Sequence, residues 1–360
     1  MSSQTSLELR LADQDESVRA FAAEDAGFDN NVEAIEPLVA RLRVETSRFV
    51  RDAIFTALAR MTHATVVDHA VQLLESDDAF LRNEAVTLLR TRGQDAIERL
   101  IETFRQTDAD VRKFLLDAVS GMPGQHPEGL LLLGLEDPDI NVRIAAIEHL
   151  GTRVRPELKE QFETVLLRED DPMLLSTVLT ALEEVGDAET WSIVEQRYPN
   201  PSEYLPFLAP QILRLMAKWG SYDCLGKLFA VNVKIRASRM GDWLDSLETL
   251  HDRFRFRTLS AEQFGTIWAE YEGSSNTLSQ YRLLRWFGRL EDQPDILNIL
   301  TSQLLHENST VRKGAVLGIA KLGTAAARGT LLSHLPIESD PEVRAILTDN
   351  LAEEFGAQLA

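Results

Sequence analysis

The chain has 360 residues, 44% of them apolar, and a formal net charge of −20 at pH 7. This acidic balance disfavours nucleic acid and anionic membranes as the main partner, because contacts to phosphate draw on lysine and arginine. The single cysteine, Cys224, excludes an internal disulfide and a cysteine-rich metal site, and the absence of a signal-peptide core or a run of 18 apolar residues predicts a cytoplasmic protein.

In chain order, residues 5–28 predict a short helix and one longer helix, which we interpret as a half-repeat cap. Residues 32–190 predict five helix pairs joined by short polar linkers. The clearest helix lies within residues 136–151. Asp139 can cap its N-terminus, and Val142, Ala146 and Leu150 recur at i, i+4 and i+8 on one apolar face.

This helix recurs along the chain, marked by an apolar residue followed by arginine. The first five arginines are 32, 31, 30 and 31 residues apart and the last two are 32 apart, mostly with Asp or Asn four residues earlier. A fixed period of this size is typical of stacked helix pairs. The arginines are Arg19, Arg51, Arg82, Arg112, Arg143, Arg312 and Arg344, and the residues before them are Asp15, Asp78, Asp108, Asp139, Asn308 and Asp340.

Residues 191–290 interrupt the period but keep helical periodicity. All five Trp and all five Tyr lie here, and residues 201–290 hold 12 basic and 9 acidic side chains, against 20 and 38 in residues 1–200. The most concentrated basic and aromatic stretch is Arg253-Phe254-Arg255-Phe256-Arg257. The repeats resume in residues 291–360, so we expect three sections, 1–190, 191–290 and 291–360, of one continuous solenoid.

The pattern D-x-x-V-R-x-x-A-x-x-x-L on the second helix of each pair resembles the HEAT repeat. In its short form it looks most like the phycobilisome lyase-type HEAT-like repeats of bacteria. The resemblance covers residues 1–190 and 291–360 and only poorly the section between them. It implies an all-α fold, a right-handed solenoid of about ten or eleven helix pairs.

The recurring Asp and Arg are consistent with either an anion-binding or catalytic site or a structural ladder. In a stack, each arginine can bond to the backbone or a carboxylate of the neighbouring repeat. A functional site is local, whereas this pair recurs in most repeats, so we interpret the recurring residues as a structural ladder.

For function, the sequence predicts a non-enzymatic scaffold or adaptor that binds another protein on the concave face of the solenoid. Second-helix positions beside the ladder arginines should form that face. The aromatic rings of the middle section either fill gaps between irregular repeats or anchor a compact acidic partner. The predicted partner-binding residues are Asp52, Thr56, Asn83, Thr87, Lys113, Asp117, Ile144 and Glu148 on the face, and Arg253, Phe254, Arg255, Phe256 and Arg257 in the middle section.

Three enzymatic functions are alternatives to this scaffold. The lyase-type resemblance implies attachment, removal or isomerisation of a bilin on a phycobiliprotein, with arginines on the propionates and aromatic side chains on the rings. A HEAT-like di-iron site needs repeated His-Glu pairs, of which the chain has only His306-Glu307 and the reversed Glu148-His149. A DNA glycosylase would need a basic track beside Trp219 and Asp223. We therefore assign no catalytic residue, metal ligand or cofactor.

Overall fold

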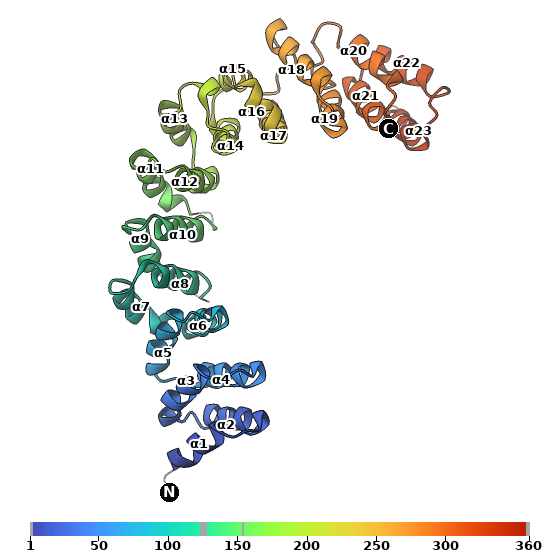
Figure 1. Ribbon diagram of the computed structural model, residues 1–360. Helices are drawn as coiled ribbons and strands as arrows, with labels where there is room; N and C mark the ends of the chain where they lie inside the picture. The colour runs from blue at the N-terminus through green and yellow to red at the C-terminus, as the bar shows by residue number, and fades with distance from the viewer. Residues whose placement is uncertain (1–2, 123–127, 153–154, 358–360) are drawn as a thin grey trace. The chain divides into compact units, whose positions relative to one another are not determined.

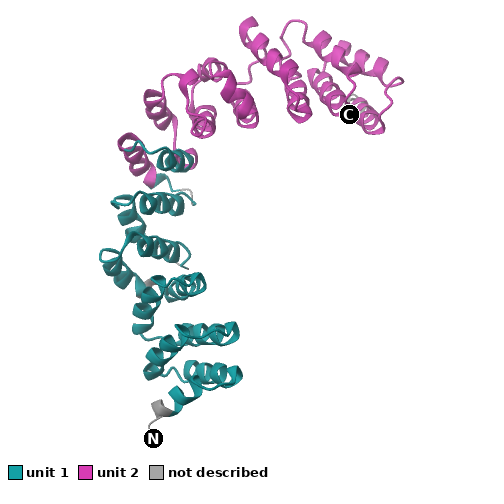
Figure 2. Cartoon of the chain, viewed as in Figure 1, with its two compact units in different colours: residues 1–157, 169–181 teal, residues 158–168, 182–360 magenta. Residues whose placement is uncertain are grey.

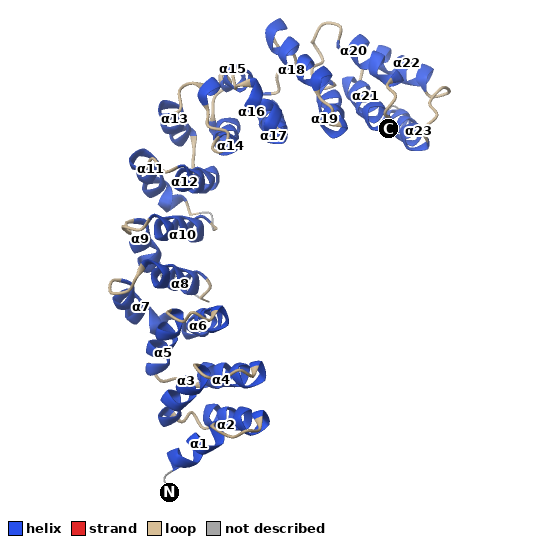
Figure 3. Cartoon of the chain, in the orientation of Figure 1, coloured by secondary structure: helices blue, strands red, loops and turns tan. Residues whose placement is uncertain are grey.

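The computed structural model describes residues 3–122, 128–152 and 155–357, and its regular elements in these ranges are all helices (Figures 1 and 3). Each repeat packs a first helix against a second helix. The first helices are α1 (Ser3–Leu11), α3 (Ile35–Leu42), α5 (Thr65–Leu74), α7 (Ile97–Phe104), α9 (Glu128–Leu135), α11 (Lys159–Arg168), α13 (Ala188–Arg197), α15 (Cys224–Phe229), α18 (Ala261–Gly273), α20 (Ile296–Ser302) and α22 (Ala325–His334). The second helices are α2 (Glu16–Phe28), α4 (Arg48–Arg60), α6 (Ala79–Arg92), α8 (Ala109–Ser120), α10 (Ile140–Gly151), α12 (Pro172–Val185), α14 (Ala209–Trp219), α16 (Val233–Ser238) with α17 (Met240–Phe254), α19 (Thr277–Phe287), α21 (Ser309–Leu322) and α23 (Pro341–Ala357).

The described helices make eleven pairs, because α16 and α17, separated only by Arg239, together take the place of one second helix. The predicted all-α solenoid of ten or eleven pairs is therefore confirmed. Short 3-10 turns precede or follow several helices, at Val32–Ala34, Gly93–Ala96, Pro156–Leu158, Pro201–Glu203 and Gln303–Leu305.

Most second helices begin where the sequence pattern predicts, because a side chain caps the N-terminus; α4 and α14 are exceptions without a side-chain cap. The carboxylate of Asp139 accepts hydrogen bonds from the backbone N–H groups of Asn141 and Val142, at 2.8 and 3.3 Å. A side-chain oxygen that satisfies these otherwise unpaired donors stabilises a helix by about 1 kcal/mol. The equivalent caps are Asp15, Asp78, Asp108, Asp171, Asn308 and Asp340.

The apolar faces of the helices form the core between the two helices of each pair and between neighbouring pairs. Val142, Ala146 and Leu150 of α10 are all buried, as the periodicity predicts. Burial of apolar surface is the main favourable contribution to folding, and in a solenoid it extends from each repeat to the next.

The chain divides into two compact units (Figure 2). The first comprises residues 1–157 and 169–181, and the second comprises residues 158–168 and 182–360. In the first unit, α2, α4, α6, α8 and α10 pack in succession as one layer, with the first helices beside them. In the second unit, α14, α17, α19, α21 and α23 pack in the same way.

Aromatic side chains fill the space left by the irregular first helices of the second unit. Trp243 is fully buried, and its indole Nε1 donates to the carbonyl oxygen of Leu228 at 2.9 Å. Trp191, Trp286 and Tyr271 are also buried. These rings therefore pack in the core, as one of the two sequence interpretations proposed.

Candidate interaction surfaces

The recurring arginines join successive repeats through a common geometry. The Nη1 of Arg112 donates to the carbonyl oxygen of Thr107 at 2.6 Å, within the turn that precedes its own helix. Its Nε and Nη2 donate to the two carboxylate oxygens of Asp137 in the next repeat, at 2.7 and 2.8 Å. Such a fork of two parallel hydrogen bonds is strong and directional. The same fork joins Arg19 to Glu45 and Arg312 to Glu338.

The remaining four arginines depart from the fork in different ways. Arg51 pairs with Asp78 at 2.7 Å and Arg143 with Glu169 at 3.1 Å, in each case through one nitrogen. Arg82 bonds to the carbonyl oxygen of Ser76 at 2.6 Å and lies over the Phe114 ring, and no carboxylate of the described residues pairs with it. Arg344, in the last repeat, bonds to the carbonyl oxygen of Glu338.

The carboxylates in these pairs are mostly not the recurring aspartates that the sequence singled out. Asp15, Asp108, Asp139 and Asp340 cap their helices, and only Asp78 both caps and pairs with an arginine. The partners instead lie two residues before the capping residue. That acidic position is visible in the sequence and could have been found from it. The partners at this position are Glu45, Asp137, Glu169 and Glu338.

Two of these carboxylates remain ionised far into the acidic range. Burial raises the pKa of Glu45, but hydrogen bonds from Arg19, the Ser47 N–H and Arg41 outweigh it and lower the pKa to about 2. Burial likewise raises the pKa of Glu338, and hydrogen bonds mainly from Arg312 bring it down to about 2. Hydrogen bonds to the charged form of an acid favour that form.

One further arginine of this kind lies in the middle section and was missed by the sequence interpretation. Arg236 follows the capping residue Asn232 by four positions, and its Nη1 donates to the carbonyl oxygens of Phe229, at 3.0 Å, and of Val231. Its Nε donates to Glu270 Oε1 at 3.0 Å. The signal was present, because Asn232-Val-Lys-Ile-Arg236 matches the repeat with Asn for Asp and Ile for Val.

The second helices of the first unit carry the residues predicted to line the concave face. Asp52, Thr56, Asn83, Thr87 and Glu148 are exposed, whereas Lys113, Asp117 and Ile144 are half-buried. Asp117 Oδ1 lies 2.8 Å from Nε2 of His149 on the next second helix. These residues lie on α4, α6, α8 and α10, and their role in partner binding stays a prediction.

The stretch from Arg253 to Arg257 ends α17 and begins the following loop. Arg253 and Arg255 are exposed, and Arg255 has φ 48°, the left-handed conformation that ends a helix. The Phe256 ring is 7% exposed and packs against His251 and Trp286. The expectation that Phe256 lies on an exposed contact surface is therefore wrong, because this ring fills the core between α17 and α19.

Several basic side chains of the middle section already pair with acidic ones. Arg257 contacts Glu291 at 2.7 Å and Asp292 at 3.0 Å. Other pairs connect the exposed sides of successive second helices, so most of the local excess of basic residues is used within the fold. These pairs are Glu183 and Asp242 with Arg214, Asp245 and Glu248 with Arg282, and Asp252 with Arg289.

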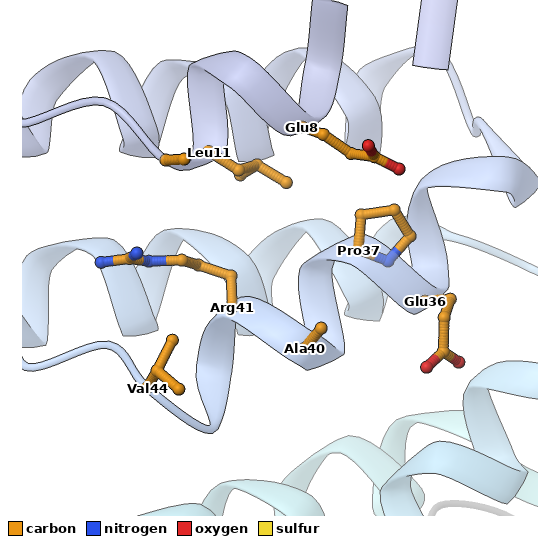
Figure 4. Close-up of a pocket in the computed structure, with 8 residues that line it drawn as sticks. Glu8, Leu11, Glu36, Pro37, Ala40, Arg41 and Val44 are labelled. Carbon is orange, nitrogen blue, oxygen red and sulfur yellow. The ribbon is translucent and has the colours of Figure 1, made fainter. Parts of the chain in front are cut away.

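A cleft of about 390 Å³ lies between α1 and α3 (Figure 4). Its lining is mostly apolar, including Leu11, Pro37 and Val44, and its guanidinium, that of Arg41, already bonds to Glu45. Within the described residues, no group of three or more His, Cys, Asp or Glu is placed to hold a metal ion. No helix in that part of the chain is long and apolar enough to cross a membrane.

The repeat geometry places the chain in a known class. A family model described as HEAT repeats matches residues 5–90, 127–205 and 268–352, more than half of the chain. The chain therefore belongs to the HEAT-repeat family. A comparison with curated proteins finds no match.

Several solved structures are similar to the chain at low sequence identity, and Kap121p shares its fold. Kap121p is 12% identical over 97% of this chain and 44% of its own, with a TM-score of 0.54. This chain therefore spans less than half of Kap121p. An engineered protein is 17% identical over 98% of both chains, with a TM-score of 0.35. The complex of CpcE and CpcF of phycocyanin lyase from Nostoc sp. PCC7120 is 18% identical over 70% of this chain and 95% of that chain, with a TM-score of 0.27.

Proposed function

We propose that this protein is a non-enzymatic scaffold that binds an acidic protein partner through the end of α17 and the exposed side of its second helices. One observation carries the proposal. Arg253 and Arg255 are exposed, and no carboxylate of the described residues pairs with either. In a chain with a net charge of −20, these two guanidinium groups can attract a negatively charged surface.

Aromatic side chains beside these arginines support the same proposal. The guanidinium of Arg253 lies 4.8 Å from the centre of the half-buried Phe254 ring. Tyr222 is 51% exposed, and its ring lies 5.7 Å from that of Phe254. Arginine and tyrosine together are enriched among the residues that dominate binding energy at protein interfaces.

The comparisons support a protein-binding role at the level of the fold. Kap121p, which shares this solenoid, has also been solved bound to RanGTP. The bilin alternative has less support, because the cleft of the middle section at α16 and α18 is lined by no Trp, Tyr or Phe.

The test compares two double variants with the same loss of charge. Arg253→Ser with Arg255→Ser should weaken binding of the purified natural partner by about thirty- to a thousandfold, because contacts of this kind contribute about 1–2 kcal/mol each. It should also flatten the dependence of Kd on salt concentration. Arg257→Ser with Arg282→Ser is the control, since both arginines already pair with carboxylates.

Calorimetry with both variants, after circular dichroism has confirmed intact helix content, separates the outcomes. Unchanged affinity of the Arg253 and Arg255 variant at low and high salt would contradict the proposal. Equal weakening by both variants would also contradict it, because the effect would then come from net charge and not from this surface.

A further inference from the structure

Arg236 of the middle section uses its guanidinium less completely than the forked arginines do. In Arg19, Arg112 and Arg312, both Nε and Nη2 bond to a carboxylate. In Arg236 only Nε bonds to the acid, at Oε1 of Glu270. Nη2 of Arg236 and Oε2 of Glu270 have no hydrogen-bond partner within the described residues, which leaves one donor nitrogen and one acceptor oxygen unused.

A serine at the usual acidic position explains the difference. In the forked pairs the acid two residues before the cap also accepts the backbone N–H of the capping residue, as Asp137 does from Asp139 at 2.9 Å. Before α19 the capping residue is Asn276, and Ser274 takes the equivalent position. Its hydroxyl accepts the Asn276 N–H at 3.1 Å. Serine thus preserves the turn but supplies no carboxylate.

The unused groups border a cleft of about 650 Å³, a volume in the range of small-ligand sites. The side chains of Arg236 and Glu270 line it and are only 10% and 12% exposed. Val233, Ala237 and Met240 contribute apolar surface, while Thr266, Ser274 and Ser275 contribute hydroxyl groups. The cleft thus combines a nearly buried ion pair with a mixed apolar and polar wall.

We propose that this cleft binds a primary carboxamide, the group at the end of an Asn or Gln side chain. The amide oxygen accepts a hydrogen bond from Nη2 of Arg236, and the amide NH₂ donates to Oε2 of Glu270. A carboxylate would bond to Arg236 but would be repelled by Glu270. An ammonium would bond to Glu270 but would be repelled by Arg236. Of these three groups, only the neutral amide satisfies both residues, and the proposal is independent of the surface at Arg253 and Arg255.

The first test measures preference between two neutral-backbone probes, N-acetyl-glutamine methylamide and N-acetyl-glutamate methylamide. Binding is followed by the ¹⁵N NMR signal of the Arg236 Nε–H group in the full-length protein. We expect about a tenfold preference for the glutamine probe, from one good hydrogen bond against one repulsive contact. Equal shifts with both probes, or none at 100-fold excess of either (about 50 mM), would overturn the proposal.

Glu270→Gln inverts the chemistry of the site. The new amide oxygen still accepts from Nε of Arg236, so the amide NH₂ replaces Oε2 and the cleft presents two donors. The preference should then reverse in favour of the glutamate probe. Glu248→Gln makes the same change in the exposed pair with Arg282 and should leave the preference as in the unmodified protein. An unreversed preference in a folded Glu270→Gln variant contradicts the assignment.

Ala269→Trp provides a variant that leaves the ion pair untouched. Ala269 is exposed on α18 and lines the cleft, so an indole there should fill it and abolish the shift of the Arg236 signal. A shift that persists would place the binding elsewhere and contradict the proposal. A Gly-Gly-Gln-Gly-Gly peptide identifies the natural source of the amide. Tenfold tighter binding than the capped residue indicates a partner segment, and equal binding indicates a free small carboxamide.

Discussion

The regular repeats and the middle repeats join one helix pair to the next by different polar contacts. In the regular repeats a guanidinium fork reaches a buried turn carboxylate, as between Arg112 and Asp137. In the middle section, pairs such as Arg282 with Asp245 connect the sides of second helices and are partly exposed. Buried pairs are costly to break, whereas exposed pairs contribute about 0–1 kcal/mol. The regular repeats therefore use most of their arginines to hold the fold together, whereas the middle repeats leave some available.

The largest effect should come from removing one forked arginine. Arg112→Ala leaves the nearly buried Asp137 without its fork, so we expect a loss of about 3 kcal/mol in the free energy of unfolding. Arg82→Ala removes an arginine at the same position of the preceding repeat but strands no carboxylate. It should cost about 1 kcal/mol. Urea denaturation followed by circular dichroism measures both.

Which of these two variants loses more unfolding free energy shows whether the forks stabilise the stack. A loss for Arg82→Ala as large as that for Arg112→Ala would show that the arginine stem, and not its carboxylate, holds the repeats together. The regular and the middle repeats would then differ less than their contacts suggest.

The second effect concerns the contact between the middle section and the C-terminal repeats. The backbones of α19 and α21 approach so closely that a Cβ on Gly318 would lie 2.3 Å from the carbonyl oxygen of Leu284. Gly318→Ala must push the two helices apart, and we expect a loss of about 2 kcal/mol.

Gly329→Ala is the matched control for this substitution. Gly329 lies in α22, and a Cβ there would meet nothing within 4 Å. Alanine should therefore stabilise that helix by about 0.5 kcal/mol through its higher helix propensity. Thermal unfolding of the two variants should shift Tm in opposite directions, and a lower Tm for both would contradict the contact.

A smaller effect should distinguish the middle section from the regular repeats by the pH at which each loses stability. Burial and the nearby positive charges of Arg289 and Arg255 lower the pKa of His251 from its ordinary 6.5 to about 4, although the charge of Asp252 acts to raise it. The neutral ring is favoured in the folded state, so this stability is present above pH 6.5 and is lost as the pH falls towards 4. Glu45 and Glu338 have pKa values of about 2, so the stability that their ionised carboxylates contribute is lost only as the pH falls below 4.5.

The middle section should therefore weaken at a pH where the forks are intact. Between pH 7 and 5 we expect the unmodified protein to lose about 1–2 kcal/mol of unfolding free energy, and His251→Phe to lose less. Phenylalanine suits the site because Nδ1 of His251 has no partner and the ring packs against Phe256 and Trp286. If the urea midpoint falls by the same amount in both proteins between pH 7 and pH 5, His251 is not the cause.

Much of the fold could be predicted from the sequence because its determinants act over a few residues. Asp139 caps α10 through N–H groups two and three residues away, and Val142, Ala146 and Leu150 share a face through the helical period alone. The repetition of these local signals every 30 to 32 residues then predicts stacking.

The candidate sites depended on the tertiary structure because their groups come from different repeats. Whether Arg112 meets Asp137 or Arg236 meets Glu270 is set by the register between helix pairs, across 25 and 34 residues. The burial of Phe256 likewise depends on Trp286, a residue of the next repeat. The sequence by itself determined the helices, their caps and their stacking, since these arise from local hydrogen bonds and periodic burial. Only packing between repeats decided which arginines are paired, which remain exposed, and where a cleft lies.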